Sequence, residues 1–256
     1  MTDWAALMSE LATWRREGLR LPIWWRDDDA TSDTPALAQL AALARETGMQ
    51  VHVAVIPDLI EPSLISALQG SVELIPVVHG WRHVSHAPPG EKNAEFGHRR
   101  DAAAGELQSA LSVMKRHFGA DLMKLFVPPW NRFDATLLPS LAQAGYVGLS
   151  TFGPRLAPCP LPAVVQINTH IDPIYWRGHR GLVAPGDLVA RTVAILKDRR
   201  AGSADITEPL GLLTHHLVHN ADIWEFSSEF LMRLLDGGAV VADVRAVLQA
   251  GRKPRS

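Results

Sequence analysis

Residues 21–29, Leu-Pro-Ile-Trp-Trp-Arg-Asp-Asp-Asp, join a short apolar run to three consecutive acids. The run from Leu21 to Trp25 has the length of a buried strand, and Asp27, Asp28 and Asp29 follow at its carboxyl end. Because adjacent carboxylates repel one another, we expect a metal ion or an arginine to offset their charge. Strand alternation would turn Asp27 and Asp29 one way and Asp28 the other. The alternative is a solvated turn or helix cap before Pro35.

Short apolar segments alternate with amphipathic segments through the rest of the chain. Further strands are expected at about 51–56, 72–78, 124–127, 146–149, 164–168, 210–213 and 239–241, and helices at about 4–14, 35–47, 62–68, 101–118, 135–144, 185–198, 225–235 and after 243. This alternation is typical of βα units around a parallel sheet. Because no linker or repeat divides the chain, we interpret residues 1–256 as one domain with a core of about 20–242 and a tail from Arg252.

Clusters of polar residues follow several of the predicted strands. They lie at 27–29, 79–86, 128–132 and 214–220. The carboxyl ends of strands in a parallel barrel converge on one face, where active sites are built, whereas the strands of an open doubly wound sheet diverge. The sequence therefore predicts an α/β barrel with parallel strands and outer helices.

His79 and His83 are four residues apart, a spacing that would place both imidazoles on one face of a helical turn. With one carboxylate from the acid run, they would form a three-ligand metal site with open positions for water and substrate. His86 lies three residues further on and is a candidate third ligand or a neighbour of the ligands. Such a histidine pair also occurs in ordinary polar loops, but together with the acids it indicates metal-assisted hydrolysis.

Two other strand ends carry residues suited to catalysis. Pro128-Pro129-Trp130 is expected to form a rigid loop because proline fixes φ, although an ordinary strand exit with a core tryptophan is the alternative. His215 and His216 follow another strand, and two adjacent histidines rarely both face a core. One neutral imidazole at this position could serve as a general acid.

The composition limits the kinds of binding partner and the cellular compartment that we expect for this protein. The formal net charge is -2, so no nucleic-acid or acidic-membrane partner is indicated. Cys159 is the only cysteine, which excludes an intrachain disulfide and is typical of a reducing compartment. The first residues lack the features of a signal peptide, and no apolar run approaches the roughly 18 residues of a membrane span. We therefore expect a cytoplasmic protein.

Taken in order, these segments resemble the motifs of the NodB-type polysaccharide deacetylases, metal-dependent carbohydrate esterases that remove N-acetyl groups from glycans. The family's first motif is a strand end of the type Thr-Phe-Asp-Asp-Gly, followed by a Thr-Pro helix start. Alignment of that pair to Thr34-Pro35 puts the two family aspartates on Asp27 and Asp28. Asp29 then replaces the usual glycine, which leaves a one-residue slip of this alignment open.

The second motif, His-Ser/Thr-x-x-His, is matched by His79 and His83. The third, Arg-Pro-Pro-aromatic, is matched by Val127-Pro128-Pro129-Trp130 without its arginine. In the family that arginine orients the base aspartate, and here Arg26, Arg100 or Arg132 could substitute.

The fourth motif ends in Asp-Trp and is echoed only loosely by Asp172 to Trp176. The last motif, Leu-x-His, is matched by Leu213-Thr214-His215. The resemblance implies a distorted (β/α)7 barrel, which agrees with the strands and helices predicted above.

The resemblance also implies residue roles. A divalent cation, Zn²⁺ in the first place with Co²⁺, Mn²⁺ or Ni²⁺ as alternatives, would be held by Asp28, His79 and His83. Asp27 would be the general base and His215 the general acid, with His216 as its alternative. The Trp130 backbone N–H would stabilise the oxyanion. The residues that would support the ligands or bind substrate are Asp29, His86, Pro129, Arg132, Asp172, Trp176 and His216, of which Asp172 would orient His215.

The reaction implied by the resemblance is removal of an N-acetyl or O-acetyl group from a carbohydrate. Two alternatives stay open: a metal-dependent amidase or deacetylase acting on a small non-sugar amide, and a carbohydrate-binding relative that keeps the barrel without catalysis.

Overall fold

The computed structural model describes residues 2–250, so the expected tail from Arg252 lies outside the described residues. Its strands are β1 Pro22–Ala30, β2 Val51–Val55, β3 Leu74–His79, β4 Leu125–Val127, β5 Gly148–Leu149, β6 Val165–Gln166, β7 Leu210–Thr214 and β8 Val240–Val241. The α-helices are α1 Ala5–Arg16, α2 Pro35–Thr47, α3 Pro62–Leu68, α4 Ala103–Phe118, α5 Leu138–Ala144, α6 Pro185–Arg200, α7 Ala221–Asp236 and α8 Val244–Ala250.

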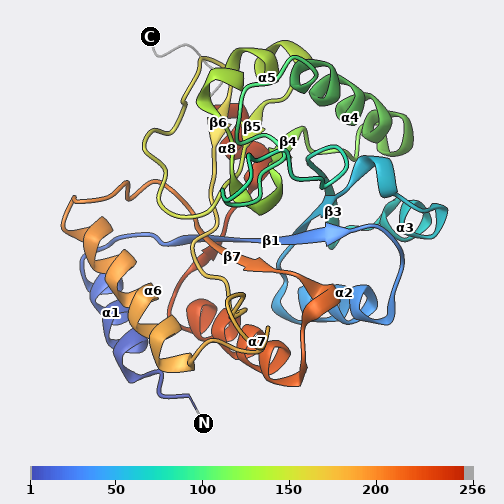
Figure 1. Ribbon diagram of the computed structural model, residues 1–256. Helices are drawn as coiled ribbons and strands as arrows, with labels where there is room; N and C mark the ends of the chain where they lie inside the picture. The colour runs from blue at the N-terminus through green and yellow to red at the C-terminus, as the bar shows by residue number, and fades with distance from the viewer. Residues whose placement is uncertain (1, 251–256) are drawn as a thin grey trace.

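The strands form one parallel sheet in the order β6-β5-β4-β3-β2-β1-β7, with β8 paired to the start of β1. Helices surround the strands: α4 and α5 lie on one side of β1, and α1, α2, α6 and α7 on the other (Figure 1). Hydrogen bonds join β7 to the segment that follows β6, and they bring the two ends of the sheet together. Ile171 N donates to Gly211 O at 3.1 Å, and Leu213 N donates to Ile171 O at 2.8 Å. The predicted distorted (β/α)7 barrel is confirmed.

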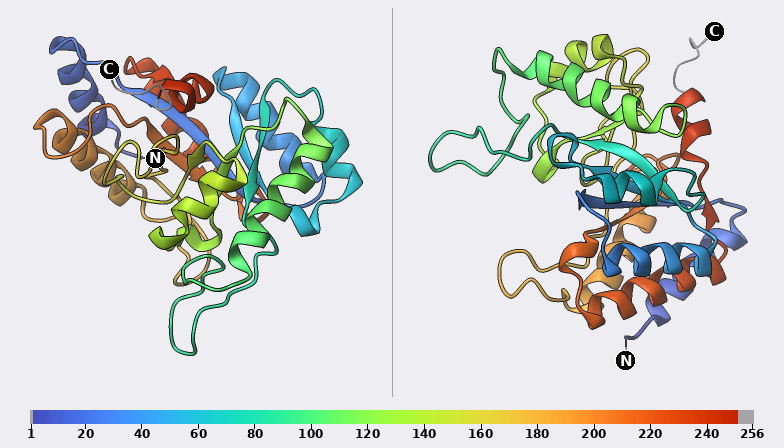
Figure 2. Two further views of the ribbon diagram at one scale, coloured as in Figure 1. Left: turned by 90° about the horizontal axis from the view of Figure 1, so that it is seen from above. Right: turned by 90° about the vertical axis from the view of Figure 1, so that its right-hand side faces the viewer.

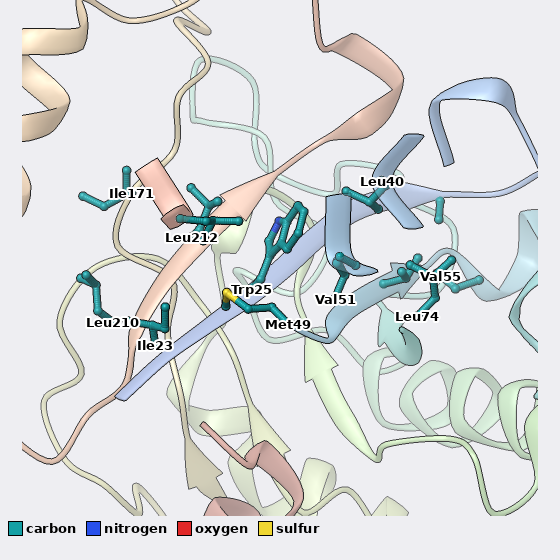
Figure 3. Packing of buried hydrophobic residues seen from close by; sticks show 14 of the residues in the cluster. Ile23, Trp25, Leu40, Met49, Val51, Val55, Leu74, Ile171, Leu210 and Leu212 are labelled. Atoms are coloured by element: carbon teal, nitrogen blue, oxygen red, sulfur yellow. The ribbon is translucent and has the colours of Figure 1, made fainter. Parts of the chain in front are cut away.

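The two faces of β1 lie in different apolar clusters. Ile23 and Trp25 pack in the large cluster that includes Leu40 of α2 and Leu212 of β7 (Figure 3). Trp24 belongs to a smaller cluster, formed by strand residues of the barrel and by Val244 and Leu248 of α8. Alternate residues of β1 thus face the helical layer and the barrel interior, as expected for a parallel strand buried on both faces.

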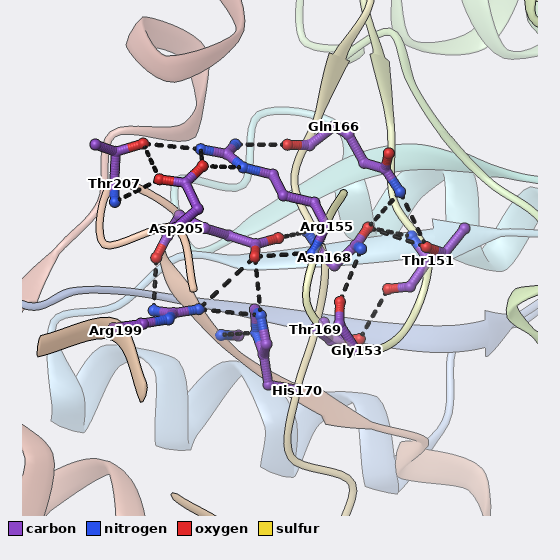
Figure 4. A network of polar contacts seen from close by, with 12 residues as sticks. Thr151, Gly153, Arg155, Gln166, Asn168, Thr169, His170, Arg199, Asp205 and Thr207 are labelled. Carbon is purple, nitrogen blue, oxygen red and sulfur yellow. Dashed lines mark hydrogen bonds and ion pairs between the residues drawn. The ribbon is translucent and has the colours of Figure 1, made fainter. Parts of the chain in front are cut away.

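A buried polar network joins the segment after β6 to the loop between α6 and β7 (Figure 4). Arg199 of α6 donates to Glu208 O at 2.6 Å, and the Glu208 carboxylate accepts from Asn168 N at 3.2 Å. His170 lies against both Arg199 and Glu208 and accepts from Gly211 N at 3.1 Å. Because these groups hydrogen-bond one another, they can be buried beside the strands that close the barrel.

Most predicted elements agree with the structure to within a few residues, and the main difference lies at β1. The sequence predicted that the strand would end at Trp25 with the acids after it, whereas β1 extends through Ala30 and includes them. The helix predicted at 225–235 begins earlier, at Ala221, because Asn220 Oδ1 caps it by accepting from Ile223 N at 3.0 Å. Among residues 2–250 no helix is long and apolar enough to cross a membrane.

Candidate metal centre and active-site cavity

A cavity of about 800 Å³ lies where the carboxyl ends of the strands meet. Its lining takes residues from the ends of β1 and β3 and from the segments after β4, β5, β6 and β7, namely Asp28, Asp29, His79, Trp130, Phe152, Asp172 and His215. The loop from β3 to α4 and the loop from β6 to α6 project on the same side of the molecule (Figure 2, right). The polar clusters predicted from the sequence therefore converge on one face, as a parallel barrel requires.

Asp29, His79 and His83 bring three ligand atoms to within 4.8 Å of one another. Asp29 Oδ1 lies 3.0 Å from His79 Nε2 and 3.2 Å from His83 Nε2. His79 Nδ1 lies 3.0 Å from Val127 O and donates to that carbonyl, while Nε2 faces Asp29 Oδ1. The contact between His79 Nδ1 and Val127 O orients the ring in the way that metal-binding histidines are usually held.

Charge is concentrated at this group. Burial by itself would raise the pKa of Asp29, but hydrogen bonds with His79 and His83 hold it below its ordinary value. Burial would lower the pKa of His79, yet the charge of Asp28 and the contact with Asp29 raise it. Asp29 Oδ1 faces the Nε2 atoms of both histidines, and one carboxylate with two imidazoles is a donor set suited to a divalent cation.

The backbone that carries the two histidines is not the helical turn predicted from their spacing. His79 ends β3, and Gly80 and His83 both have left-handed φ values, 58° and 57°. Glu95, which is buried, fixes the turn by accepting from Trp81 N at 3.1 Å and from Arg82 N at 2.7 Å. The two rings converge because the chain reverses after β3, so the predicted proximity of His79 and His83 arises from a different backbone geometry.

The strand alternation expected for the three acids does not hold in β1. The pairing of β1 with β2 is irregular between Asp27 and Ala30, and Asp29 has a left-handed φ of 74°. This bulge breaks strand alternation, so that Asp28 and Asp29 both line the cavity. Asp27, expected to be the base, is fully buried and does not line the cavity, and Asp28, expected to be a ligand, is not in the three-residue cluster.

Asp28 is held by Arg26, two residues before it on the same strand. Arg26 Nε donates to Asp28 Oδ1 at 2.8 Å, and Nη2 donates to Oδ2 at 3.0 Å. The same guanidinium donates to Ser150 Oγ and to Asn131 Oδ1, both at 2.6 Å. Arg26 is fully buried, and its fork fixes both carboxylate oxygens of Asp28.

The other two arginines considered for this position lie elsewhere. Arg100 pairs with Glu106 on α4, and Arg132 donates to Asn93 O at 2.6 Å. Of the three sequence candidates, Arg26 is therefore the one that contacts an aspartate of the acid run. Sequence reasoning missed Ser150, Asn131 and Glu95, because hydroxyl, amide and single acidic side chains in loops carry no pattern of their own.

Asp27 forms a separate buried pair with His216. Its Oδ1 lies 2.5 Å from His216 Nδ1, and its Oδ2 accepts from Thr214 Oγ1 at 2.6 Å and from His216 N at 3.0 Å. Burial by itself would raise the pKa of Asp27, but the charge and hydrogen bond of His216 lower it, and Asp27 in turn raises the pKa of His216. The pair ties β1 to the end of β7, so His216 does not take part in the cavity lining.

His215 lines the cavity and packs against Trp176. The two ring centroids are 4.7 Å apart at an interplanar angle of 74°. His215 Nδ1 is buried and has no hydrogen-bond partner among the described residues. Asp172 does not bond to His215 as expected: it accepts from Trp176 Nε1 at 2.7 Å and from Ile174 N at 2.9 Å. Burial raises the pKa of Asp172.

The remaining predicted site residues divide between the cavity and its surroundings. Trp130, with φ 56°, has its ring centroid 4.3 Å from that of His83 at an interplanar angle of 51°, and Arg132 is also part of the lining. Pro129 is buried under Gly80 and supports the turn. His86 is exposed and lies outside both the lining and the three-residue cluster, because the chain has left the cavity at that point.

The sequence matches no protein-family model and no curated protein. Similar solved structures exist. One is a family 4 carbohydrate esterase from Streptomyces lividans in complex with acetate: 15% identity, 90% of this chain and 95% of that chain covered, TM-score 0.55. Another is a family 4 acetyl xylan esterase from Clostridium thermocellum in complex with a cobalt ion: 11% identity, 89% and 90% covered, TM-score 0.51. A third is a mutant peptidoglycan deacetylase from Bacillus subtilis: 15% identity, 92% and 93% covered, TM-score 0.52.

These likenesses extend over almost the whole of each chain. The protein therefore has the fold of the family 4 carbohydrate esterases and NodB-type polysaccharide deacetylases, as the resemblance of its motifs implied.

Proposed function

We propose that the protein is a metal-dependent hydrolase that removes an N-acetyl or O-acetyl group from a carbohydrate. The observation that carries the proposal is the convergence of Asp29, His79 and His83 in one cavity with Asp28 and His215. A two-histidine, one-carboxylate set leaves positions open for water and substrate, which distinguishes catalytic sites from closed structural ones. The names of the similar structures, carbohydrate esterases and deacetylases, support the same activity.

In this proposal Asp29, His79 and His83 hold the cation. The two family aspartates then correspond to Asp28 and Asp29, one residue later than first expected. The bound cation would supply Lewis-acid chemistry by acidifying water and polarising the acyl carbonyl. The choice of Zn²⁺ over Co²⁺, Mn²⁺ or Ni²⁺ stays a prediction, although one similar structure contains cobalt.

The proposed acid and base lie in the same cavity. Asp28, oriented by the Arg26 fork, takes the proton from the attacking water. His215 gives a proton to the departing nitrogen or oxygen, so that the acyl C–N or C–O bond breaks and acetate is released. The Trp130 backbone N–H is the proposed oxyanion donor, an effect typically worth about 3–4 kcal/mol in the transition state.

Aromatic side chains favour a sugar over a small non-sugar amide. Tyr175 and Trp176 are about two-fifths exposed, and both line the cavity. Exposed aromatic faces of this kind suit the apolar face of a pyranose ring. We also propose a reducing, cytoplasmic location, on the basis of the single cysteine.

The test is acetate release from acetylated chito-oligosaccharides, acetylated xylan and small acetamides after loading with each candidate metal. We expect turnover of a carbohydrate that is lost with chelator and restored by metal. His215→Ala should keep the metal and lose roughly 10²–10⁴-fold in kcat, the range for removing a general acid. His117→Ala on α4, far from the cavity, is the matched control and should retain the wild-type rate. A metal-loaded protein that releases no acetate from any of these substrates would overturn the proposal.

A further inference from the structure

The rim of the active-site cavity is rich in arginine. Its lining includes Arg132 after β4, Arg177 and Arg180 in the loop from β6 to α6, and Arg191 in α6. Three separate segments of the chain thus place guanidinium groups around one opening. The chain as a whole has a formal net charge of -2, so this concentration of positive charge is local to the cavity.

Three of these guanidinium groups have no protein partner. Among residues 2–250, Arg177, Arg180 and Arg191 make no hydrogen bond or ion pair, and all three are exposed. Buried arginines of the same protein are fully engaged: Arg26 is held by Asp28, and Arg155 by Asp205. The donors at the rim are therefore available to a ligand.

The carboxylates of the lining do not neutralise this rim. Asp28 is engaged by Arg26, and Asp29 faces His79 and His83. Asp172 accepts from Trp176 Nε1 and from a backbone N–H. Guanidinium groups that no carboxylate pairs with attract ligands of the opposite charge to this rim.

We propose that the carbohydrate acted on carries an anionic group, a carboxylate or a phosphate, that is bound by Arg177 and Arg180. This inference rests on the proposed function, because it names the substrate class of the same site. Tyr175 and Trp176 precede these arginines in the same loop, so a sugar ring stacked there would bring its anionic substituent within reach of both. Guanidinium groups suit both anions because their planar N–H donors match two oxygens at once.

The experiment compares three matched substrates: N-acetylglucosamine, its 6-phosphate, and N-acetylmuramic acid, which carries a carboxylate. For the wild type we expect kcat/KM to be at least about tenfold higher for one anionic substrate than for the neutral sugar, since a charge-assisted hydrogen bond corresponds to roughly that factor. The difference should lie in KM and should diminish with added salt. Which anionic substrate is preferred identifies the anion as phosphate or carboxylate.

The variant Arg177→Gln/Arg180→Gln should lose this preference, so that its kcat/KM becomes equal for the neutral and the anionic sugars. Arg116→Gln/Lys197→Gln is the control, because it removes the same charge from exposed helix positions outside the cavity and should keep the preference. Equal kcat/KM for neutral and anionic substrates in the wild type would overturn the inference and leave the hydrolase proposal standing.

A binding measurement separates failure of the inference from failure of the hydrolase proposal. Calorimetric titration of metal-free protein with the same three sugars reports the arginines without turnover. Arginine-dependent binding of an anionic sugar, together with no acetate release by the metal-loaded protein, would support the anionic ligand and sink the hydrolase proposal. Failure of the anionic sugars to bind more tightly than the neutral one would overturn the inference.

Discussion

At the scale of single residues, the acid run is stabilised by three different partners. Asp27 is paired with His216, Asp28 with Arg26, and Asp29 with His79 and His83. Each carboxylate is thus compensated separately, although the three are adjacent in sequence. Because an ionised carboxylate cannot be buried without such compensation, the pairings of the buried Asp27 and Asp28 are needed for the fold, and that of Asp28 also serves the proposed chemistry.

Removal of the Arg26 guanidinium should destabilise the protein strongly. Arg26→Met leaves the buried Asp28 carboxylate without its partner, and breaking a buried ion pair in this way typically costs about 3–5 kcal/mol. Arg26→Met/Asp28→Leu removes both charges and should recover much of that loss. Urea denaturation of the two variants beside the wild type measures the difference. A single variant as stable as the wild type would show that Arg26 does not compensate Asp28.

The residue types of the site could be predicted from the sequence, but their register could not. The three adjacent acids and the HxxxH pair can be recognised in the sequence. The cavity lining contains two of the acids, Asp28 and Asp29, and both histidines. Asp29, and not Asp28, lies against the two histidines, and the left-handed φ of Asp29 accounts for this position. A non-glycine residue rarely adopts that conformation, so strand alternation gave the wrong orientation for this one residue.

At the scale of elements, the turn after β3 is fixed by close packing around Gly80. A Cβ atom at this position would lie 2.1 Å from Glu95 Oε2 and 2.6 Å from Pro129 Cγ. The same Glu95 carboxylate holds the backbone between His79 and His83. The position of His83 relative to His79 therefore depends on the absence of a side chain at residue 80.

Gly80→Ala should weaken metal binding because it displaces Glu95 or Pro129 and strains a backbone with φ 58°. Gly90→Ala is a matched control in the same loop: φ is 86°, but the added Cβ would meet nothing within 4 Å. The control should lose only about 1 kcal/mol of stability and keep its metal affinity. Zinc titration with a competing chromophoric chelator measures the metal affinity of both variants. Equal metal affinity in the two variants would contradict this account of the turn.

Most helix and strand positions were predictable because their ends carry strong local signals. Thr34 caps α2 by accepting from Leu37 N at 3.1 Å, and Gly48 ends it with φ 65°. The turn between His79 and His83 carries no comparable signal, since it depends on Glu95 and Pro129 from other parts of the chain. Tertiary packing, and not local sequence, determines its shape.

At the scale of the whole molecule, the closed barrel buries histidines that stay neutral. His52 on β2 is buried, its Nδ1 lies 3.0 Å from Trp25 O, and its Nε2 has no hydrogen-bond partner among the described residues. Burial lowers the pKa of His52 to about 4. In the unfolded chain the same group titrates near its ordinary pKa of about 6.5.

This pKa difference predicts a specific loss of stability in acid. Above about pH 6.5 both states are neutral at His52; between 6.5 and about 4 only the unfolded state takes up the proton, so the native state loses up to about 3 kcal/mol. Below about pH 4 the contribution is constant. His52→Gln should show a shallower decline of unfolding free energy across this window than the wild type. Identical slopes from pH 7 to pH 4 would contradict a neutral, buried His52.

The barrel itself was predictable because the polar clusters follow strand ends, and only a converging sheet brings such clusters together. The way in which the two ends of the sheet are joined was harder to predict from the sequence. The segment that joins β6 to β7 contributes a few hydrogen bonds and a buried network around Glu208, formed by residues distant in sequence. Such long-range pairings leave no periodic pattern along the chain.

The central claim is that Asp29 holds the metal and Asp28 acts beside it. The direct test is metal content by mass spectrometry after dialysis against zinc, with Asp29→Asn, Asp28→Asn and the wild type in parallel. We predict about one zinc ion per chain in the wild type and in Asp28→Asn, and loss of tightly bound zinc in Asp29→Asn. Loss of zinc in Asp28→Asn with retention in Asp29→Asn would contradict the account and restore the earlier register.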